Sequence, residues 1–189
     1  MSEIKAKIKS DFFRYAGTFS STQFLKFFLK NSYFRFQVYL RLSRSRNIFL
    51  SSFFKLLKAG LGKKVNIQLS PKVPIGYGLY IPHGNIVVNS KTIIGNNCSL
   101  LQFVSIGALH NGAAANIGDN VYIGPNVNIV GPINIGSNAV LGAGAVVVKD
   151  VECNVVVVGT PAKVIKKVTD ISDYGENLCP SDWIHEMSK

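Results

Sequence analysis

The residues that decide the fold run from Ile117 to Cys153 and read IGDNVYIGPNVNIVGPINIGSNAVLGAGAVVVKDVEC. An apolar residue returns at every sixth position, and the series is Ile117, Ile123, Ile129, Ile135, Leu141, Val147 and Cys153. A second apolar series is offset by four, at Val121, Val127, Ile133, Ala139, Ala145 and Val151. A period of six fits neither an α-helix nor a single strand. It is typical of a parallel β-helix, in which three short strands complete one triangular coil.

The repeat extends back to about Ile67, with two interruptions. The first is one extra residue within Pro82–Asn85. The second separates Ile106 from Ile117 by eleven residues, where six would suffice, so residues 109–116 must leave the coil as a loop. Insertions into such repeats are usually found on the binding face. We therefore expect functional residues at both interruptions.

Charge divides the chain of 189 residues into unlike parts. Residues 1–64 hold fourteen basic and two acidic residues, a net charge of +12, whereas the remainder holds seven basic and eight acidic residues. The first part is also rich in phenylalanine and patterned for helices over about residues 3–16, 22–42 and 48–59. We predict three parts: a basic aromatic helical segment (1–64), a β-helix domain (65–167) and a C-terminal tail (168–189).

Two interpretations of the segment 1–64 remain open. Its aromatic residues and interleaved cations are typical of helices that lie on a membrane surface. Alternatively, the helices pack against the coil or a neighbouring subunit and the cations are simply solvated. A nucleic-acid partner is not expected, because no known binding module accompanies the charge.

The compartment follows from three observations. The three cysteines, Cys98, Cys153 and Cys179, show no paired spacing, which favours a reducing cytoplasm over a disulfide framework or a zinc site. The N-terminus does not resemble a signal peptide. No run is long and apolar enough to predict a spanning helix. We expect a cytoplasmic protein, at the inner face of the membrane under the first interpretation of residues 1–64.

Histidine is the residue type of interest, since its ordinary pKa lies near neutrality and suits proton transfer. The chain has three, His83, His110 and His185. His83 lies in the irregular repeat, where a core residue of a regular coil would be aliphatic. His110 lies in the loop and His185 in the tail. An isolated histidine can be a purely structural residue, but its place at an interruption makes His83 the candidate general base.

Taken together, the six-residue repeats, the irregular segment at His83, the loop and the closing run Gly159-Thr160-Pro161-Ala162-Lys163 resemble the hexapeptide-repeat acyltransferases. The resemblance covers about residues 65–167. It is strongest to the serine acetyltransferase branch and, within it, to acetyltransferases of polysaccharide and colanic acid biosynthesis. It implies a left-handed parallel β-helix, a homotrimer, acetyl-CoA as the donor substrate, no metal, and active sites between subunits.

The resemblance also implies roles for individual residues. His83 takes the place of the catalytic base, and Gln68 takes the place of a carboxylate that orients it. Asn85 and His110 are the candidates for acceptor binding. The donor is expected to lie along small residues and one cation, namely Gly107, Ala108, Pro125, Ala143 and Lys163.

Two departures from the family pattern bear on the acceptor. The residue before the histidine is a carboxylate that helps to hold serine in the serine enzymes, and here it is Pro82. A second histidine of those enzymes corresponds to Ala114. Both departures favour a sugar hydroxyl of a surface polysaccharide or its precursor as the acceptor. The alternatives are a serine O-acetyltransferase and a non-catalytic trimeric scaffold, while a carbonic anhydrase would need three converging histidines.

Overall fold

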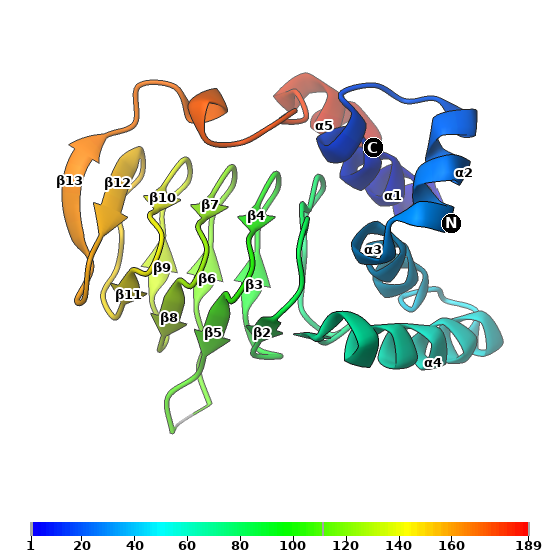
Figure 1. The fold of residues 1–189 in the computed structure, drawn as a ribbon, viewed down its shortest axis with the longest axis horizontal. Helices are drawn as coiled ribbons and strands as arrows, with labels where there is room; N and C mark the ends of the chain where they lie inside the picture. The colour runs from blue at the N-terminus through cyan, green and yellow to red at the C-terminus, as the bar shows by residue number, and fades with distance from the viewer. Residues whose placement is uncertain (1, 111, 189) are drawn as a thin grey trace.

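The computed structural model describes residues 2–110 and 112–188 and has two parts, helices at one end and a β-coil at the other (Figure 1). The helices are α1 (Ser2–Ala16), α2 (Ser21–Lys30), α3 (Ser32–Leu42) and α4 (Ile48–Val65). The coil strands are β1 (Ile67–Leu69), β2 (Ile86–Val88), β3 (Ile93–Ile94), β4 (Ser99–Leu100), β5 (Ser105–Gly107), β6 (Asn116–Ile117), β7 (Tyr122–Ile123), β8 (Asn128–Val130), β9 (Asn134–Ile135), β10 (Val140–Leu141), β11 (Val146–Val147) and β12 (Val155–Val158).

Three sheets of stacked strands form the walls of the coil. One has the order β1-β2-β5-β8-β11, the second is β3-β6-β9, and the third runs β4-β7-β10-β12. The pairing between coil strands is parallel, and its register places Ile106 beside Ile129 and Ile129 beside Val147. These side chains are almost fully buried. The six-residue series is thus a stack of aliphatic side chains along the coil axis, and the predicted parallel β-helix with an N-terminal helical segment is confirmed.

Asparagine forms a ladder along the edge where the second sheet turns into the third. Asn97, Asn120, Asn138 and Asn154 all have left-handed φ angles, between 54° and 59°. Asparagine tolerates this conformation better than other residues with a side chain. The side-chain Nδ2 of each of the first three donates to the side-chain Oδ1 of the next asparagine along the ladder, at 3.0, 2.9 and 2.8 Å. The corners are therefore stabilised by cross-rung hydrogen bonds as well as by local turn geometry.

The second and third walls of the first turn of the coil, residues 73–81, have no strand beneath them and would expose unpaired backbone groups. Helical side chains supply the missing partners. Asp11 of α1 accepts from the Leu79 amide, and Gln37 of α3 accepts from the Ile81 amide and donates to the Leu79 carbonyl. Tyr15 donates to the Ile81 carbonyl at 2.6 Å. The helices thus cap the coil by means of their polar side chains.

Two arginines of the basic segment take part in the same cap. Arg41 forms a bidentate pair with Asp11, at 2.8 and 2.9 Å, and donates to the carbonyls of Ile75 and Gly76. Arg14 donates to the carbonyl of Gly78 and the hydroxyl of Ser99. Both arginines are buried. Part of the charge predicted to be solvated is therefore internal.

The helical segment differs from the sequence prediction in two places. The predicted helix over 22–42 is divided at Asn31, whose side chain accepts from the Phe34 amide and caps α3. The helix predicted to end near residue 59 continues to Val65, because Gly60 and Gly62 do not stop it. Gly62 is instead the point of close approach to the coil, where an added Cβ would lie 3.0 Å from the carbonyl oxygen of Ile67.

The C-terminal residues return along the coil to the helices (Figure 1). Strand β13 (Lys163–Lys167) pairs antiparallel with β12 at the far end of the coil. A short 3₁₀ turn (Ile171–Asp173) and helix α5 (Ser181–Ser188) follow, and Trp183 packs edge-on against Phe13 of α1. The tail therefore joins the two ends of the molecule.

Candidate functional site

Five corners of the coil stack along the edge where the third sheet turns into the first, and we call this the His83 edge. It consists of Pro82–Asn85, Gln102–Phe103, Pro125–Asn126, Ala143–Gly144 and Gly159–Ala162. The three middle corners are joined by backbone hydrogen bonds: the Asn126 amide donates to the Gln102 carbonyl, and the Gly144 amide to the Pro125 carbonyl, both at 2.9 Å. The pairing of Val87 with Ser105 places Pro82–Asn85 next to the first of them. The first interruption of the repeat therefore stands at the head of a continuous row of small and polar residues.

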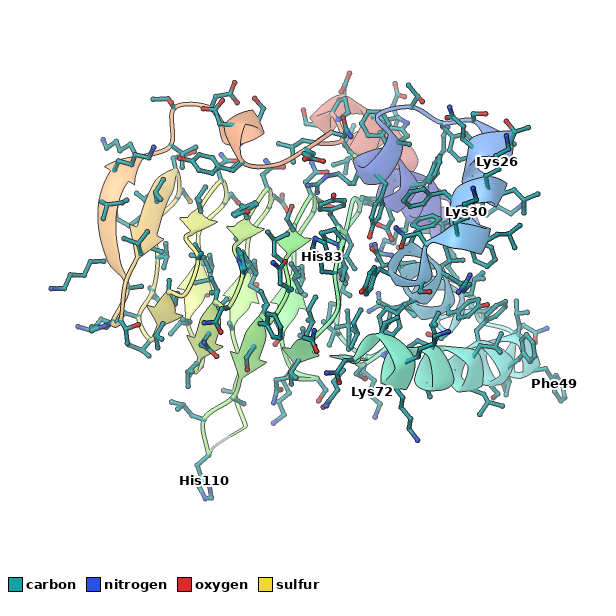
Figure 2. The ribbon with its side chains drawn as sticks, viewed as in Figure 1. Lys26, Lys30, Phe49, Lys72, His83 and His110 are labelled. Carbon is teal, nitrogen blue, oxygen red and sulfur yellow. The ribbon has the colours of Figure 1, made fainter. Side chains whose placement is uncertain are left out.

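His83 is exposed to solvent at the start of this row (Figure 2). The ring of Tyr33 from α3 approaches it edge-on, with 6.3 Å between ring centroids. Ile81, two residues earlier, is held by both Tyr15 and Gln37. The position of His83 is thus set by helices α1 and α3 as well as by the coil.

Gly84 allows the chain to pass close to the end of α4 directly after the histidine. A Cβ added there would lie 1.9 Å from the carbonyl oxygen of Val65, a backbone atom that ends α4. We expect Gly84→Ala to lower the free energy of unfolding by about 1–3 kcal/mol, since overpacking against backbone forces a shift. Chemical denaturation measures this loss.

Gly60→Ala is the matched control, because a Cβ at that helical position meets nothing within 4 Å. It is expected to be neutral or slightly stabilising, as alanine is the better helix former. A Gly84→Ala variant as stable as Gly60→Ala would show that the corner has more room than this structure gives it.

The two remaining predicted residues near His83 lie close to the junction of α4 with β1. Asn85 has a left-handed φ of 60°, and its side chain accepts from the amide of Asn66 at 2.6 Å. Gln68 is an exposed residue of β1, paired with Val87. Within the described part of the chain neither His83 nor Gln68 has a side-chain hydrogen bond. The orienting role of Gln68 therefore stays a prediction.

The predicted donor residues divide between two edges of the coil. Pro125 and Ala143 lie on the His83 edge, and Lys163 follows directly after its last corner. Gly107 and Ala108 lie at the opposite end of β5, where the loop leaves the coil, and His110 lies in that loop far from His83 (Figure 2). One chain therefore does not bring the two groups together.

A neighbouring corner holds two features that the sequence analysis missed. Phe103 has a left-handed φ of 64° with its ring half exposed, a strained conformation for a bulky residue. The Gln102 Oε1 atom is buried and has no hydrogen-bond partner among the described residues. Strain and an unsatisfied acceptor one corner from His83 are typical of a binding site. The signal available in the sequence was a phenylalanine at a corner where Asn recurs.

Carboxylates are absent from a long stretch of chain around this site. No Asp or Glu occurs between Asp11 and Asp119. Asp11 is buried in its pair with Arg41, and Asp119 belongs to another edge of the coil, next to the asparagine ladder. The corner of His83 thus receives no negative charge from residues 12–118.

Two of the three cysteines, Cys98 and Cys179, are buried, whereas Cys153 is exposed. Burial raises the pKa of the Cys98 and Cys179 thiols to about 12, so neither is a ready nucleophile. Across residues 2–110 and 112–188 no group of three or more His, Cys, Asp or Glu side chains is placed to hold a metal ion.

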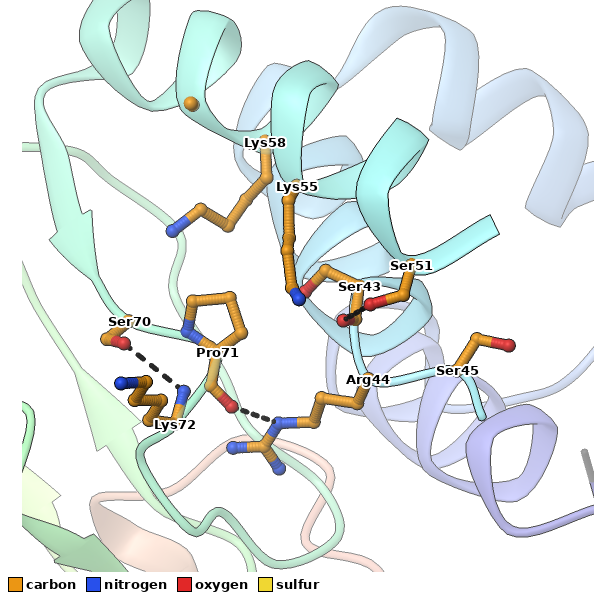
Figure 3. A pocket seen from close by; sticks show the side chains of 10 residues that line it. Ser43, Arg44, Ser45, Ser51, Lys55, Lys58, Ser70, Pro71 and Lys72 are labelled. Atoms are coloured by element: carbon orange, nitrogen blue, oxygen red, sulfur yellow. Dashed lines mark hydrogen bonds between the residues drawn. The ribbon is translucent and has the colours of Figure 1, made fainter. Parts of the chain in front are cut away.

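A depression of about 580 Å³ lies away from His83, between α4 and the first coil (Figure 3). Its lining is cationic, with Arg44, Lys55, Lys58 and Lys72. Arg44 donates to the Pro71 carbonyl at 2.8 Å, and burial lowers its pKa to about 10. None of the residues predicted to be catalytic lines this depression.

Comparison with known proteins points to one family. Residues 114–149 match the model described as bacterial transferase hexapeptide (six repeats). Serine acetyltransferase from Buchnera aphidicola is 31% identical over 125 residues, which are 64% of this chain and 46% of the relative. Serine acetyltransferase 4 of Arabidopsis thaliana is 36% identical over 119 residues, which are 59% of this chain and 34% of the relative. The chain spans less than half the length of either relative.

A solved structure covers more of both chains. The serine acetyltransferase of Neisseria gonorrhoeae in complex with serine has a TM-score of 0.70 and 30% identity, over 86% of this chain and 69% of that one. The expected closeness to polysaccharide and colanic acid acetyltransferases is not supported, since these relatives are all named serine acetyltransferases. This chain therefore belongs to the hexapeptide-repeat acetyltransferases, in the serine acetyltransferase family.

Proposed function

We propose that this protein transfers an acetyl group from acetyl-CoA to a hydroxyl, with His83 as the general base. The observation that carries the proposal is the His83 edge, where an exposed histidine heads a row of corners built from small residues. Family membership supports the same reaction class. The activity is stated as a proposal, because the chain covers less than half the length of these curated relatives.

The reaction requires one proton acceptor at the attacking oxygen. An imidazole nitrogen of His83 takes the hydroxyl proton as the oxygen attacks the thioester carbonyl. The tetrahedral intermediate then collapses, the carbon–sulfur bond breaks, and the leaving CoA sulfur takes up a proton. The product is an O-acetyl ester together with free CoA thiol.

The row of corners can accommodate the donor. A Cβ at Gly144 would meet nothing within 4 Å, so space is open above that corner. The Gln102 Oε1 has no partner among the described residues, and an amide of the pantetheine arm can supply one once the side chain turns outward. Lys163, at the end of the row, offers a positive charge for the phosphates of the nucleotide. These residues support acetyl-CoA as the donor through open space, an unpaired acceptor and a positive charge.

A homotrimer is part of the proposal. The His83 edge and the edge with Gly107, Ala108 and His110 lie apart in one chain. Two copies packed side by side can place these edges against each other and so complete a site. A cytoplasmic location is also proposed, because the three cysteines are free.

Two acceptors are proposed, each for its own reason. L-Serine is supported by the relatives, which are named serine acetyltransferases. A sugar hydroxyl is favoured by the lack of carboxylates near His83. Pro82 precedes His83, and residues 12–118 contain no Asp or Glu. A charged amine on the acceptor would therefore find no counter-charge in that part of the chain. Burying an ammonium without a counter-charge is costly, whereas an uncharged hydroxyl compound carries no such cost.

Release of free CoA thiol from acetyl-CoA, measured with L-serine and separately with a panel of sugars, tests the proposal. Turnover that requires a hydroxyl compound is expected, and the compound that supports it identifies the acceptor. Turnover with L-serine alone would exclude a sugar hydroxyl as the acceptor. Turnover with sugars alone would exclude serine. No release above the acceptor-free rate with any of them would overturn the transferase proposal in favour of a scaffold.

A further inference from the structure

The helical end of the molecule carries the most exposed apolar side chains in the described chain. Among the large hydrophobic residues, the four with the highest exposure are Phe49 (88%), Ile48 (79%), Leu56 (73%) and Leu29 (64%). All four belong to α2 or α4, and the structure describes no helix long and apolar enough to cross a membrane. Large exposed apolar side chains grouped on one part of a protein indicate a surface that contacts something else.

On α4 the exposed side chains follow one stripe. Phe49, Phe53 and Leu56 are spaced by four and three residues, which places them on a single helix face. The opposite face, with Ser51 and Val65, is buried. Lys63 is seven residues beyond Leu56 and therefore continues the stripe with a positive charge, next to Lys64. The stripe is apolar at its start and cationic at its end.

Helix α2 adds a second stripe of the same kind. Leu25 and Leu29 are exposed, and Lys26 and Lys30 lie beside them on the outer side of the helix (Figure 2). No residue of α2 is buried. The helix is held by aromatic contacts of its inner face, such as Phe28 with Tyr39 of α3.

The two stripes belong to one continuous surface. Arg35 of α3 donates to the carbonyls of Phe28 and Leu29 on α2. The same arginine lines a depression of about 580 Å³ together with Leu56, Lys63 and Lys64 of α4. We call this the basic apolar surface, and its residues are Leu25, Lys26, Leu29, Lys30, Arg35, Phe49, Phe53, Leu56, Lys63 and Lys64.

Charge identifies the occupant of this surface. The segment from residue 12 to residue 64 contains no acidic residue, so no carboxylate of α2, α3 or α4 neutralises these cations. A second copy of the chain would bring the same positive charges face to face, and like charges across an interface are repulsive. Anionic phospholipid headgroups are complementary to the lysines, and the acyl boundary is complementary to the phenylalanines and leucines.

We infer that the basic apolar surface binds the protein to the face of a membrane that contains anionic lipid. Phe49, Phe53 and Leu56 enter the headgroup region, and Lys26, Lys30, Lys63 and Lys64 pair with lipid phosphates. The site at His83 is formed by other residues, so membrane binding does not depend on the proposed reaction. The helical end then holds the coil close to the membrane, together with the proposed site at His83.

Cosedimentation of the full chain with vesicles tests this inference. The chain is expected to bind vesicles of phosphatidylcholine mixed with phosphatidylglycerol, to bind phosphatidylcholine alone weakly, and to be released as salt is raised. Lys63→Gln/Lys64→Gln and Phe53→Ser/Leu56→Ser are each expected to weaken binding on the order of tenfold. Equal binding to both kinds of vesicle, unaffected by salt, would overturn the inference.

Matched controls come from the coil. Lys91→Gln/Lys149→Gln removes two exposed coil lysines, and Val164→Ser/Ile165→Ser removes two apolar side chains of β13 that are 56% and 57% exposed. Both are expected to bind vesicles like the wild type, and equal losses in them would refute the assignment to the helical end. Sedimentation velocity of Phe53→Ser/Leu56→Ser addresses the other occupant. A smaller assembly with unchanged vesicle binding would mean that a second copy covers the stripe.

Discussion

His83→Ala is expected to slow acetyl transfer by about two to four orders of magnitude, the usual contribution of a positioned general base. His83 heads the row of corners proposed to hold the donor, and the described chain places no other histidine on that edge. Because the side chain is exposed and makes no hydrogen bond with a described residue, its removal is expected to leave folding intact. Initial rates of CoA thiol release, at several acceptor concentrations, measure the effect.

The control for this variant is His110→Ala, which removes an exposed histidine of the loop. That change is expected to raise the acceptor KM rather than to lower kcat, since His110 is a candidate for acceptor binding and not for proton transfer. Thermal unfolding of both variants should match the wild type. If the His83→Ala protein turned over at the wild-type rate, the general base would have to be sought elsewhere, while the transferase proposal itself would stand.

Asp11→Ala is expected to lower the free energy of unfolding by about 3–5 kcal/mol, because it leaves the buried Arg41 guanidinium without its counter-charge. Burial raises the pKa of the Asp11 carboxyl, an effect that the paired Arg41 opposes. The same carboxylate accepts from the Leu79 amide of the first coil. Its loss therefore uncaps a backbone donor as well as breaking the ion pair. Urea denaturation followed by circular dichroism measures the change.

Glu3→Ala is the matched control, since it breaks the other ion pair recorded among the described residues, between Glu3 and Lys7 at 3.0 Å. The Glu3 side chain is 68% exposed, and such a surface pair contributes no more than about 1 kcal/mol. Asp11→Ala and Glu3→Ala with similar midpoints would contradict the idea that the helices stabilise the coil through its first turn. If Asp11→Ala instead unfolded in two steps, the helices and the coil would be two units that unfold separately once the cap between them is weakened.

Periodicity explains why so much of the coil was predictable. An inward-pointing side chain must recur once per strand. The six-residue spacing of Ile117, Ile123 and Ile129 therefore predicts the coil from local sequence, and no distant contact has to be known. An extra residue must likewise disturb the wall at a known place, which is how Pro82–Asn85 was recognised. The loop after Ile106 followed from the same counting.

The candidate site was predictable only in part. His83 stood out because it occurs at a break in the repeat, and the small residues Pro125 and Ala143 because the family places the donor there. Phe103 and Gln102 were missed, since neither strain nor an unpaired acceptor is visible in a string of residues. Gln68 is predicted from the family resemblance alone, and the structure gives it no hydrogen bond to His83.

The sequence by itself determined the coil, its two interruptions and the concentration of positive charge in residues 1–64. Only the tertiary structure decided which corners stack along the His83 edge and which of the cations are internal. The physical reason is distance along the chain: Tyr15 and Gln37 reach Ile81 across 66 and 44 residues, and no local pattern encodes such contacts. The same long-range packing buries Arg14 and Arg41 within the cap and leaves Phe49, Leu56 and Lys63 facing outward.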